Sequence, residues 1–509
     1  MRNTVNKTII FFYGALLVCP TLALLINCCS IKRRAVSAAS WASRFIGFGL
    51  IISIGLLSYL SLSKKPVTYV LLSFNTLSLL LCSLILLVSF IVHRFSLKYM
   101  EGDRLYSRYF LNLAAITLSA VIMVLADNLF LFWFSWSLSN LFLITLMVHK
   151  KEWIAAKNSG WLTLNTLLVG SLSLLAAFTL IGLNTQTASI QALNVKEFIN
   201  SPVFAATMAL ITLTALTQSA IWPFHRWLMS SLNSPTPVSA LMHAGLVNGG
   251  GILIVKFAPL FAASTSFLMV IFVLGAVSAF LGTFWKLMQY DIKRMLACST
   301  LAQMGFMMMQ CGLGLFAAAV AHLCWHGLFK AYLFLSSGSV IAQRSNKLKV
   351  DGYPPLLFLI ASISGFLGML VFAFMTNKPV LSLQATTFLL AFAFIAGTQL
   401  MLTLINSHLS IKNIIIGLLA SSLTGFIYGA SIHLIETLLP NLIPLYLPKL
   451  SLLHLSTLVL FILPWLLLNL GVLERIKESN FWCWLYMNLF NQSQPSAKTL
   501  TAFRSDYKY

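Results

Sequence analysis

Acidic residues are scarce in this chain: Asp and Glu together number 11 among 509 residues, against 33 Lys and Arg. Charged residues of either sign make up only 9% of the chain, whereas 59% of the residues are hydrophobic. Since a soluble domain carries roughly a quarter charged residues, this composition excludes a soluble globular protein. It indicates a membrane protein that crosses the bilayer many times.

Motifs that bind metals or nucleotides are also absent from the sequence. The 8 cysteines show no CxxC spacing, and most lie in apolar runs, so we interpret them as small buried hydrophobic residues. The sequence has no Gly-rich nucleotide loop and no cluster of metal-ligating residue types. We therefore expect no metal site, no cofactor and no catalytic residues in this chain.

Apolar runs long enough to cross a bilayer recur along the whole chain, since a spanning helix needs about 20 residues. We predict an all-α polytopic membrane protein with about 13–15 transmembrane helices. The first run is too long for the apolar core of a signal peptide, and we expect it to be a membrane span. The runs are 8–29, 44–62, 67–92, 106–126, 128–148, 161–182, 203–227, 236–258, 262–286, 294–312, 315–342, 355–376, 384–406, 412–436 and 452–471.

The loops between these runs differ sharply in charge. Alternate loops and their rims hold nineteen Lys and Arg residues on one side and five on the other. Under the positive-inside rule this places the N-terminus outside and the C-terminus in the cytoplasm. The net charge of +22 then indicates a basic cytoplasmic face, suited to anionic lipid or an acidic partner rather than to nucleic acid. After the last run, the charged and aromatic segment 474–490 predicts an interfacial helix, followed by a loose tail.

The segment 218–258 combines an apolar character with residues that disrupt helices. Pro223 lies deep in a predicted span, where it removes a backbone hydrogen bond and favours a helix break. Pro235 and Pro237, in the connection to the next span, are also expected to break the helix, and Gly249–Gly251 would allow close packing or local unwinding. Broken membrane helices are typical of transport proteins.

Ionisable residues also lie inside the apolar runs. His322, His326 and Lys330 are spaced i, i+4 and i+8, which puts them on one helix face about 12 Å long. Such a stripe can pass protons, because neutral imidazole both donates and accepts and a buried lysine readily loses its proton. Structural hydrogen bonds between packed helices are the alternative. His243 follows the predicted break and is a further pathway candidate, whereas Lys256 either joins the pathway or extends its amine to the membrane surface.

Four other polar positions have either a pathway role or a structural role. Asp127, in the sequence LADN, is expected to cap the following helix. Ser137 belongs to a polar patch in FWFSWSLSN, and Gln218 and His225 flank Pro223. The residue types alone leave both roles open for Ser137, Gln218 and His225.

Three blocks of the sequence resemble a known superfamily. PTPVSALMHA (235–244), DIKRMLACSTLAQMGF (291–306) and HLCWHGLFKAYLFLSSGS (322–339) are similar to signatures of antiporter-like, proton-conducting membrane subunits. That superfamily includes large subunits of respiratory complex I and of Mrp-type cation/proton antiporters. The resemblance covers roughly residues 100–345.

The resemblance implies a fold of two inverted five-helix repeats with broken helices around a hydrated polar axis. His243, His322, His326 and Lys330 match axis positions, and Lys256 matches a basic position after the first half-channel. The implied divisions are N-terminal transmembrane helices (1–99), a first repeat (100–260), a second repeat (261–410), C-terminal transmembrane helices (411–473), and an interfacial helix with a cytoplasmic tail (474–509).

Two departures from the complex I-type pattern concern its charged switch. Ser137 stands where that pattern has a membrane glutamate, and Gln218 stands where it has a lysine. Their joint loss is physically coherent, because either charge alone would be buried without a partner.

These departures, together with SPTPVSALMHAGLVNGGG and PFHRWL, resemble the DabB subunits of bacterial energy-coupled inorganic carbon transporters. The resemblance implies a bacterial inner-membrane subunit whose cation flow, expected to be H⁺, drives CO₂ hydration by a DabA-type partner. That partner is a large peripheral zinc protein related to β-carbonic anhydrases. The alternatives are a respiratory or Mrp-type antiporter subunit and a non-conducting membrane anchor.

Overall fold

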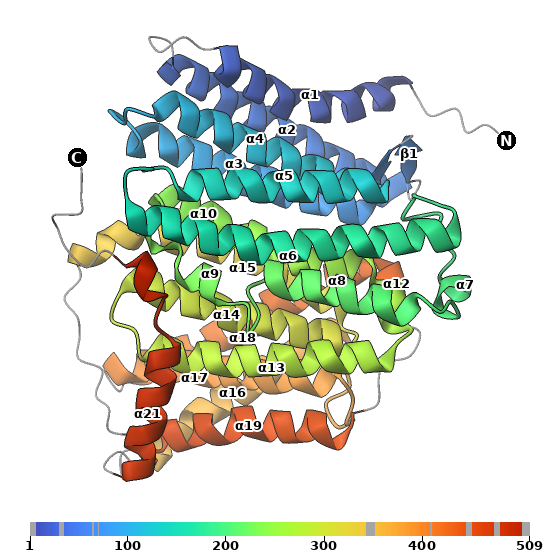
Figure 1. Cartoon of the computed structure of the whole chain (residues 1–509). Coiled ribbons are helices and arrows are strands. Elements are labelled where there is room, and N and C mark those ends of the chain that lie inside the picture. Colours follow the sequence, from blue (N-terminus) through green and yellow to red (C-terminus); the bar gives the residue numbers. More distant parts are fainter. Residues whose placement is uncertain are drawn as a thin grey trace.

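The computed structural model describes residues 7–29, 35–63, 66–69, 71–342, 352–407, 410–443, 450–472 and 479–500. These ranges form a bundle of long helices that lie roughly side by side (Figure 1). Within them, strand is confined to β1 (Val67–Tyr69) and β2 (Leu72–Phe74), which pair antiparallel in a short ribbon. The predicted all-α membrane fold is confirmed.

Among the described residues, 13 helices are long and apolar enough to cross a membrane. The remaining two predicted runs contain α8 (Phe204–Gln218) and α14 (Ile292–Gly312). Each predicted apolar run therefore contains a helix. The 13 are α1 (Lys7–Cys29), α2 (Ala35–Ser63), α3 (Thr76–Tyr99), α4 (Tyr106–Leu125), α5 (Leu129–Met147), α6 (Ile154–Thr185), α10 and α11 together (Thr236–Lys256), α13 (Thr265–Leu287), α15 (Phe316–Leu335), α16 (Pro355–Thr376), α17 (Thr386–Ser407), α18 (Ile411–Leu438) and α19 (Leu452–Asn469).

The predicted run 67–92 is wrong at both ends. Its first residues form the β1–β2 ribbon, and α3 begins only after Asn75, whose side chain accepts the Ser78 N–H at 2.8 Å and so caps the helix. At its other end α3 continues to Tyr99, beyond the apolar run. Because a helix extends past its apolar stretch wherever the ends can be satisfied, His93 lies inside α3 and is fully buried.

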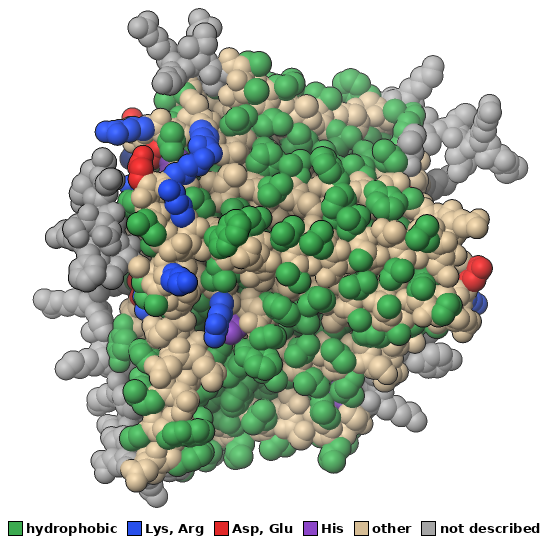
Figure 2. All heavy atoms as spheres, in the orientation of Figure 1, with side chains coloured by type: hydrophobic (Ala, Val, Ile, Leu, Met, Phe, Trp, Pro, Cys, Tyr) green, Lys and Arg blue, Asp and Glu red, His purple; other side chains and the backbone are tan. Residues whose placement is uncertain are grey.

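Basic side chains gather near one end of the helices, on the left of the face shown in Figure 2. Lys98 lies in the last turn of α3 and Arg104 in the turn before α4. Lys286 lies in the last turn of α13 and Lys293 in the first turn of α14, at this same end. The opposite end carries the short α7 (Val195–Ile199). The structure thus shows the charge asymmetry, and the cytoplasmic orientation of the basic end stays a prediction.

The C-terminal segment crosses the basic end rather than hanging free. Helix α21 (Asn480–Gln492) exposes Phe481 and Trp484, as an interfacial helix should. The residues that follow are held by the bundle: Gln289 Nε2 donates to Ser493 Oγ at 2.8 Å, and Asn233 Nδ2 donates to Thr499 O at 2.8 Å. The predicted loose tail is therefore wrong as far as Leu500, because side chains of the bundle bind the Ser493 hydroxyl and the Thr499 carbonyl.

Glycines bring α13 and α14 into backbone contact. A Cβ at Gly282 would lie 2.5 Å from Ala302 N, and one at Gly305 would lie 2.4 Å from Ala279 N. Small residues allow such close approach, which drives helix association in membranes. This packing fixes α14, which supplies part of the candidate site.

Candidate functional site

The first broken span lies in the middle of the bundle. Helix α8 ends at Gln218, Ala220 adopts a left-handed φ of 52°, and helical structure resumes only in the short α9 (Arg226–Met229). The indole Nε1 of Trp227 donates to Thr217 O at 3.0 Å and so satisfies a carbonyl freed by the break. Pro223 lies within the break as predicted, although the helix already ends five residues earlier.

The second broken span is α10 (Thr236–Ala244) followed by α11 (Gly249–Lys256). Pro235 immediately precedes α10 and Pro237 lies in its first turn, so these prolines begin a helix rather than break one. The break lies instead at the 3₁₀ turn η3 (Leu246–Asn248). The prediction of a break at Pro235 and Pro237 is therefore corrected, because a proline in the first helical turn lacks only an N–H that would have had no partner.

Side chains at the first break donate hydrogen bonds to the backbone carbonyls that are left free at the second break. Gln218 Nε2 donates to Leu246 O at 3.2 Å, and Ser219 Oγ donates to Val247 O at 2.8 Å. Gly250 permits this approach, since a Cβ there would lie 2.3 Å from Ala215 O. In a bilayer core every freed carbonyl needs such a partner, so the paired breaks form one polar junction.

A neutral amide pair occupies this junction. Asn140 Nδ2 donates to Gln218 Oε1 at 3.1 Å, and Gln218 Nε2 donates to Asn140 Oδ1 at 3.0 Å. Ser137 does not contact Gln218: it is hydrogen-bonded to Ser171 of α6. The partner of Gln218 is thus three residues beyond Ser137, almost one helical turn further along α5, and the sequence pattern alone did not identify it.

The basic residues of the predicted pathway meet at α10, α14 and α15. Lys330 Nζ donates to Leu296 O at 3.2 Å, and Thr300 Oγ1 donates to the same carbonyl at 2.9 Å. His243 Nδ1 lies 3.0 Å from Thr300 Oγ1. Since the single hydroxyl proton of Thr300 is used on Leu296 O, Nδ1 of His243 is the donor. The structure therefore joins His243 to Lys330 through two residues of α14.

The predicted stripe on α15 points into the bundle. Lys330 is 0% exposed, His326 5% and His322 8%. The imidazole rings of His322 and His326 lie almost parallel, with centroids 6.0 Å apart. Both ring nitrogens of His326 and Nε2 of His322 are buried without a hydrogen-bond partner among the described residues. Donors and acceptors so placed are available to a mobile proton or to water.

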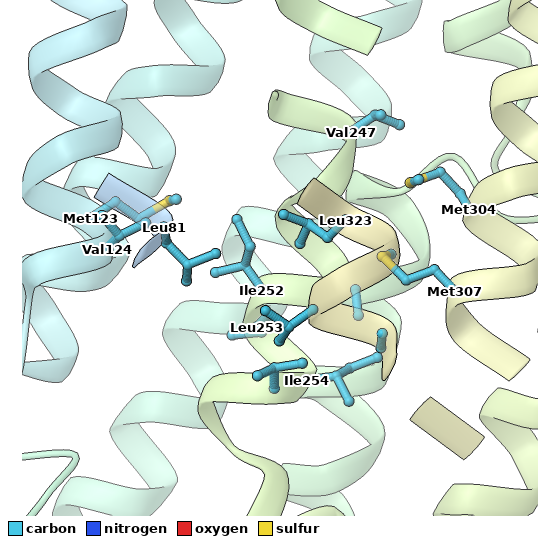
Figure 3. Packing of buried hydrophobic residues seen from close by; sticks show 14 of the residues in the cluster. Leu81, Met123, Val124, Val247, Ile252, Leu253, Ile254, Met304, Met307 and Leu323 are labelled. Carbon is cyan, nitrogen blue, oxygen red and sulfur yellow. The ribbon is translucent and has the colours of Figure 1, made fainter. Parts of the chain in front are cut away.

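Apolar side chains separate this stripe from the helices nearer the N-terminus. Ile252 and Leu323 face each other between Leu81 on one side and Met304 on the other (Figure 3). A cavity of about 50 Å³ lies beside them and reaches Gln218 at the amide junction. Since one water takes up about 30 Å³ in the liquid, this cavity has room for water between the polar groups.

Lys256 is bonded to a helix end rather than extended to the surface. Its Nζ donates to Val124 O at 3.0 Å and to Ala126 O at 2.7 Å, and it lies 5.0 Å from the ring centroid of Phe132. A cation at the C-terminal end of α4 is favoured by the partial negative charge there. The structure thus supplies a structural role for Lys256 beside any pathway role.

We expect Lys256→Met to destabilise the protein by about 1–3 kcal/mol, because charge-assisted bonds to two carbonyls are lost. Lys256→Arg should keep most of the stability. Thermal unfolding in detergent measures both, and the exposed Lys196→Met is the matched control. Unchanged unfolding of Lys256→Met would show that the amine does not hold α11 against α4.

Asp127 is not the helix cap that the sequence indicates. Asn128 Oδ1 accepts the N–H groups of Phe130 and Leu131 at 3.0 Å and caps α5. Asp127 instead accepts from Ser189 Oγ at 2.5 Å and from Gln191 N at 3.0 Å. The carboxylate therefore fixes the loop before α7, because the shorter path to the α5 amides is taken by its neighbour.

His225 lies in the first break and is buried against Trp285, with ring centroids 4.9 Å apart. Its Nδ1 has no hydrogen-bond partner among the described residues. No described bond joins it to the stripe on α15. The roles of the predicted site residues remain predictions, whereas their positions are now fixed.

Comparison with known proteins identifies the family. Residues 126–437 match the family described as NADH:quinone oxidoreductase/Mrp antiporter, TM. The chain belongs to this antiporter family. Residues 68–110 also match the N-terminal region of complex I chain 5. The main match covers all the elements that bear the junction and the stripe.

Similar proteins include transporter and respiratory subunits. The chain is 36% identical over 354 residues to "Probable inorganic carbon transporter subunit DabB1" of Halothiobacillus neapolitanus, covering 64% of this chain and 62% of that protein. It is 35% identical over 312 residues to a DabB subunit of the same description from Bacillus anthracis, covering 60% of each. It is 34% identical over 271 residues to NADH-ubiquinone oxidoreductase chain 5 of Schizophyllum commune, covering 53% of this chain and 40% of that protein.

The matched regions thus span less than two thirds of these curated relatives. Among solved structures, the Mrp complex from Dietzia sp. has a chain that covers 94% of this one with a TM-score of 0.57 and 21% identity. The chain covers 55% of that protein. This likeness shows that the fold is shared with a known multi-subunit membrane assembly. It supports the predicted antiporter-like fold.

Proposed function

We propose that this chain is the cation-translocating membrane subunit of a two-component inorganic carbon transporter, with H⁺ as the ion. The observation that carries the proposal is the buried line from His243 through Thr300 and Leu296 O to Lys330, continued by His326 and His322. Intramembrane ionisable residues of this kind face a pathway by default. Similarity to DabB subunits favours carbon transport over other uses of the fold.

His243 and Lys330 can each hold a proton, and its transfer between them needs water or rotation of the Thr300 hydroxyl, because Leu296 O only accepts. Lys330 and Thr300 both donate to Leu296 O, and His243 donates to the hydroxyl of Thr300. Protonation of one base disfavours protonation of its neighbour, because two like charges close together in a low dielectric repel strongly. A proton entering at one end therefore favours release at the other.

The chemistry of CO₂ hydration would lie in the partner. We infer a DabA-type, zinc-containing peripheral subunit bound on the cytoplasmic side, with this chain in a bacterial inner membrane, its N-terminus outside and its C-terminus inside. The basic end of the bundle and the α21 segment that crosses it support docking there. This chain then supplies the ion path and no catalytic residues.

The decisive test is co-expression with a DabA-type partner in a bacterium that lacks carbonic anhydrase. We expect growth in ambient air, loss of that growth on addition of an uncoupler, and copurification of a zinc-containing soluble protein. Copurification with quinone-linked or other antiporter-like subunits would instead favour a respiratory or Mrp-type role, which the chain 5 relative supports. Growth that persists in the presence of the uncoupler would show that the chain serves only as a non-conducting membrane anchor for its partner.

A further inference from the structure

Helix α3 carries a second line of buried polar groups, which the proposed pathway does not use. Ser89, His93 and Ser96 are spaced i, i+4 and i+7 and therefore share one face of the helix. Their exposed fractions are 1%, 0% and 0%. The line spans roughly 10 Å along the axis, from the middle of α3 toward the basic end of the bundle.

At the basic end this line reaches the surface through three further residues, Tyr109, His149 and Asp103. Ser96 Oγ lies 2.9 Å from the phenol oxygen of Tyr109. The ring of Tyr109 packs edge-on against His149, with centroids 5.6 Å apart, and His149 Nε2 lies 3.1 Å from Asp103 Oδ1. The Asp103 side chain is 24% exposed, whereas His149 is buried. An acid–imidazole pair thus stands where the line meets solvent.

Deeper in the bundle, a chain of hydrogen bonds runs from His93 through Ser89 to Thr117, and each group donates to the next. Its Nδ1 donates to Ser89 O at 2.8 Å and lies 3.1 Å from Ser89 Oγ. Ser89 Oγ and Thr117 Oγ1 are 2.6 Å apart, and Thr117 donates to Leu113 O at 2.8 Å. Because Thr117 uses its proton on Leu113 O, Ser89 donates to Thr117. The Nε2 atom of His93 is buried and has no partner among the described residues.

The line ends at the cavity beside the amide junction. Ser89 and Thr117 line this cavity of about 50 Å³ from one side, and Ser139, Gln218 and Asn248 line it from the other. The side-chain oxygen of Asn248 is buried without a partner. The other lining residues are mostly apolar, so water in this cavity would have only these polar groups as hydrogen-bond partners. The cavity therefore connects α3 to the broken helices.

We propose that this line is a proton path between the basic end of the bundle and the junction of the broken helices, open to protons in either direction. A proton bound at His93 Nε2 lets Nδ1 release its proton to Ser89 Oγ. Ser89 passes its own proton to Thr117 Oγ1, and Thr117 passes its proton to water in the cavity. Each step breaks one N–H or O–H bond and forms another, so flow toward the basic end uses the same steps in reverse order. Rotation of the hydroxyls and return of the imidazole tautomer reset the line.

The proposal rests on the proposed function, and its test separates the two. Purified wild-type assembly in vesicles, with a pH-sensitive dye inside and an imposed potential, should conduct protons. Thr117→Val, which keeps the side-chain shape and removes the hydroxyl, should lower the flux at least about tenfold, and Thr117→Ser should restore it. His93→Leu should match Thr117→Val.

The control is another buried hydroxyl pair on the same helix. Ser83 Oγ lies 2.7 Å from Ser53 Oγ, away from the path, and Ser83→Ala should conduct as the wild type does. Ser89→Ala serves as a second variant if Thr117→Val fails to assemble. Wild-type flux in Thr117→Val and His93→Leu, with flux lost in Lys330→Met, would overturn the path along α3 and leave the proposed function standing. Absence of proton flux in the wild type would overturn both.

Discussion

Replacing Lys330 with methionine should abolish coupled transport while the protein still folds and assembles. Methionine fills much the same volume, and Leu296 O keeps Thr300 as its donor, so no buried carbonyl is left unpaired. Removing a charge that is 0% exposed also removes its desolvation cost. Loss of function with normal assembly is therefore the expected result. Growth in ambient air of a carbonic-anhydrase-deficient strain, with vesicle proton flux, measures it.

His326→Ala should give the same loss, because both ring nitrogens of His326 are free to carry the proton onward. The matched control is His454, a buried histidine at the start of α19 whose Nδ1 lies 2.8 Å from Ser451 Oγ, on a helix that contributes nothing to the stripe. His454→Asn should transport as the wild type does. Full activity of both Lys330→Met and His326→Ala would refute the stripe as the ion path.

The sequence was sufficient for features that depend on helical period alone. His322, His326 and Lys330 share a face because of their spacing, and the structure places all three inside the bundle. The number of spans also followed from run length, since a bilayer sets the helix length. Both predictions depend only on the geometry of a single helix and on the thickness of the bilayer around it.

Features that depend on contacts between helices could not be predicted from the sequence. The resemblance pairs the positions of Ser137 and Gln218, but in the structure Ser137 bonds to Ser171 of α6 and Asn140 faces Gln218. Thr300 became visible only through its bond to His243. His93 was missed because the apolar run ends one residue before it, whereas the helix does not.

Replacing Gln218 and Asn140 with oppositely charged residues tests whether these two side chains are partners. Gln218→Lys and Asn140→Asp each place one unpaired charge at positions that are 4% exposed. A buried charge without a partner costs about 3–5 kcal/mol, so each single variant should unfold at lower temperature and assemble poorly. The double variant Asn140→Asp with Gln218→Lys should recover most of that loss, because the new carboxylate and amine occupy the positions of two groups now 3.0–3.1 Å apart.

The control for this experiment is Ser137→Asp combined with Gln218→Lys. Ser137 bonds to Ser171, so its carboxylate would face α6 and leave the lysine unpaired. A double-mutant cycle from thermal unfolding in detergent should give a coupling of about 2–3 kcal/mol for the Asn140 pair and close to zero for the Ser137 pair. Equal recovery by the two pairs would mean that the junction admits either register of α5. Recovery by the Asn140 pair alone would show that this chain has moved the partner of position 218 along α5 as well as removing its charge.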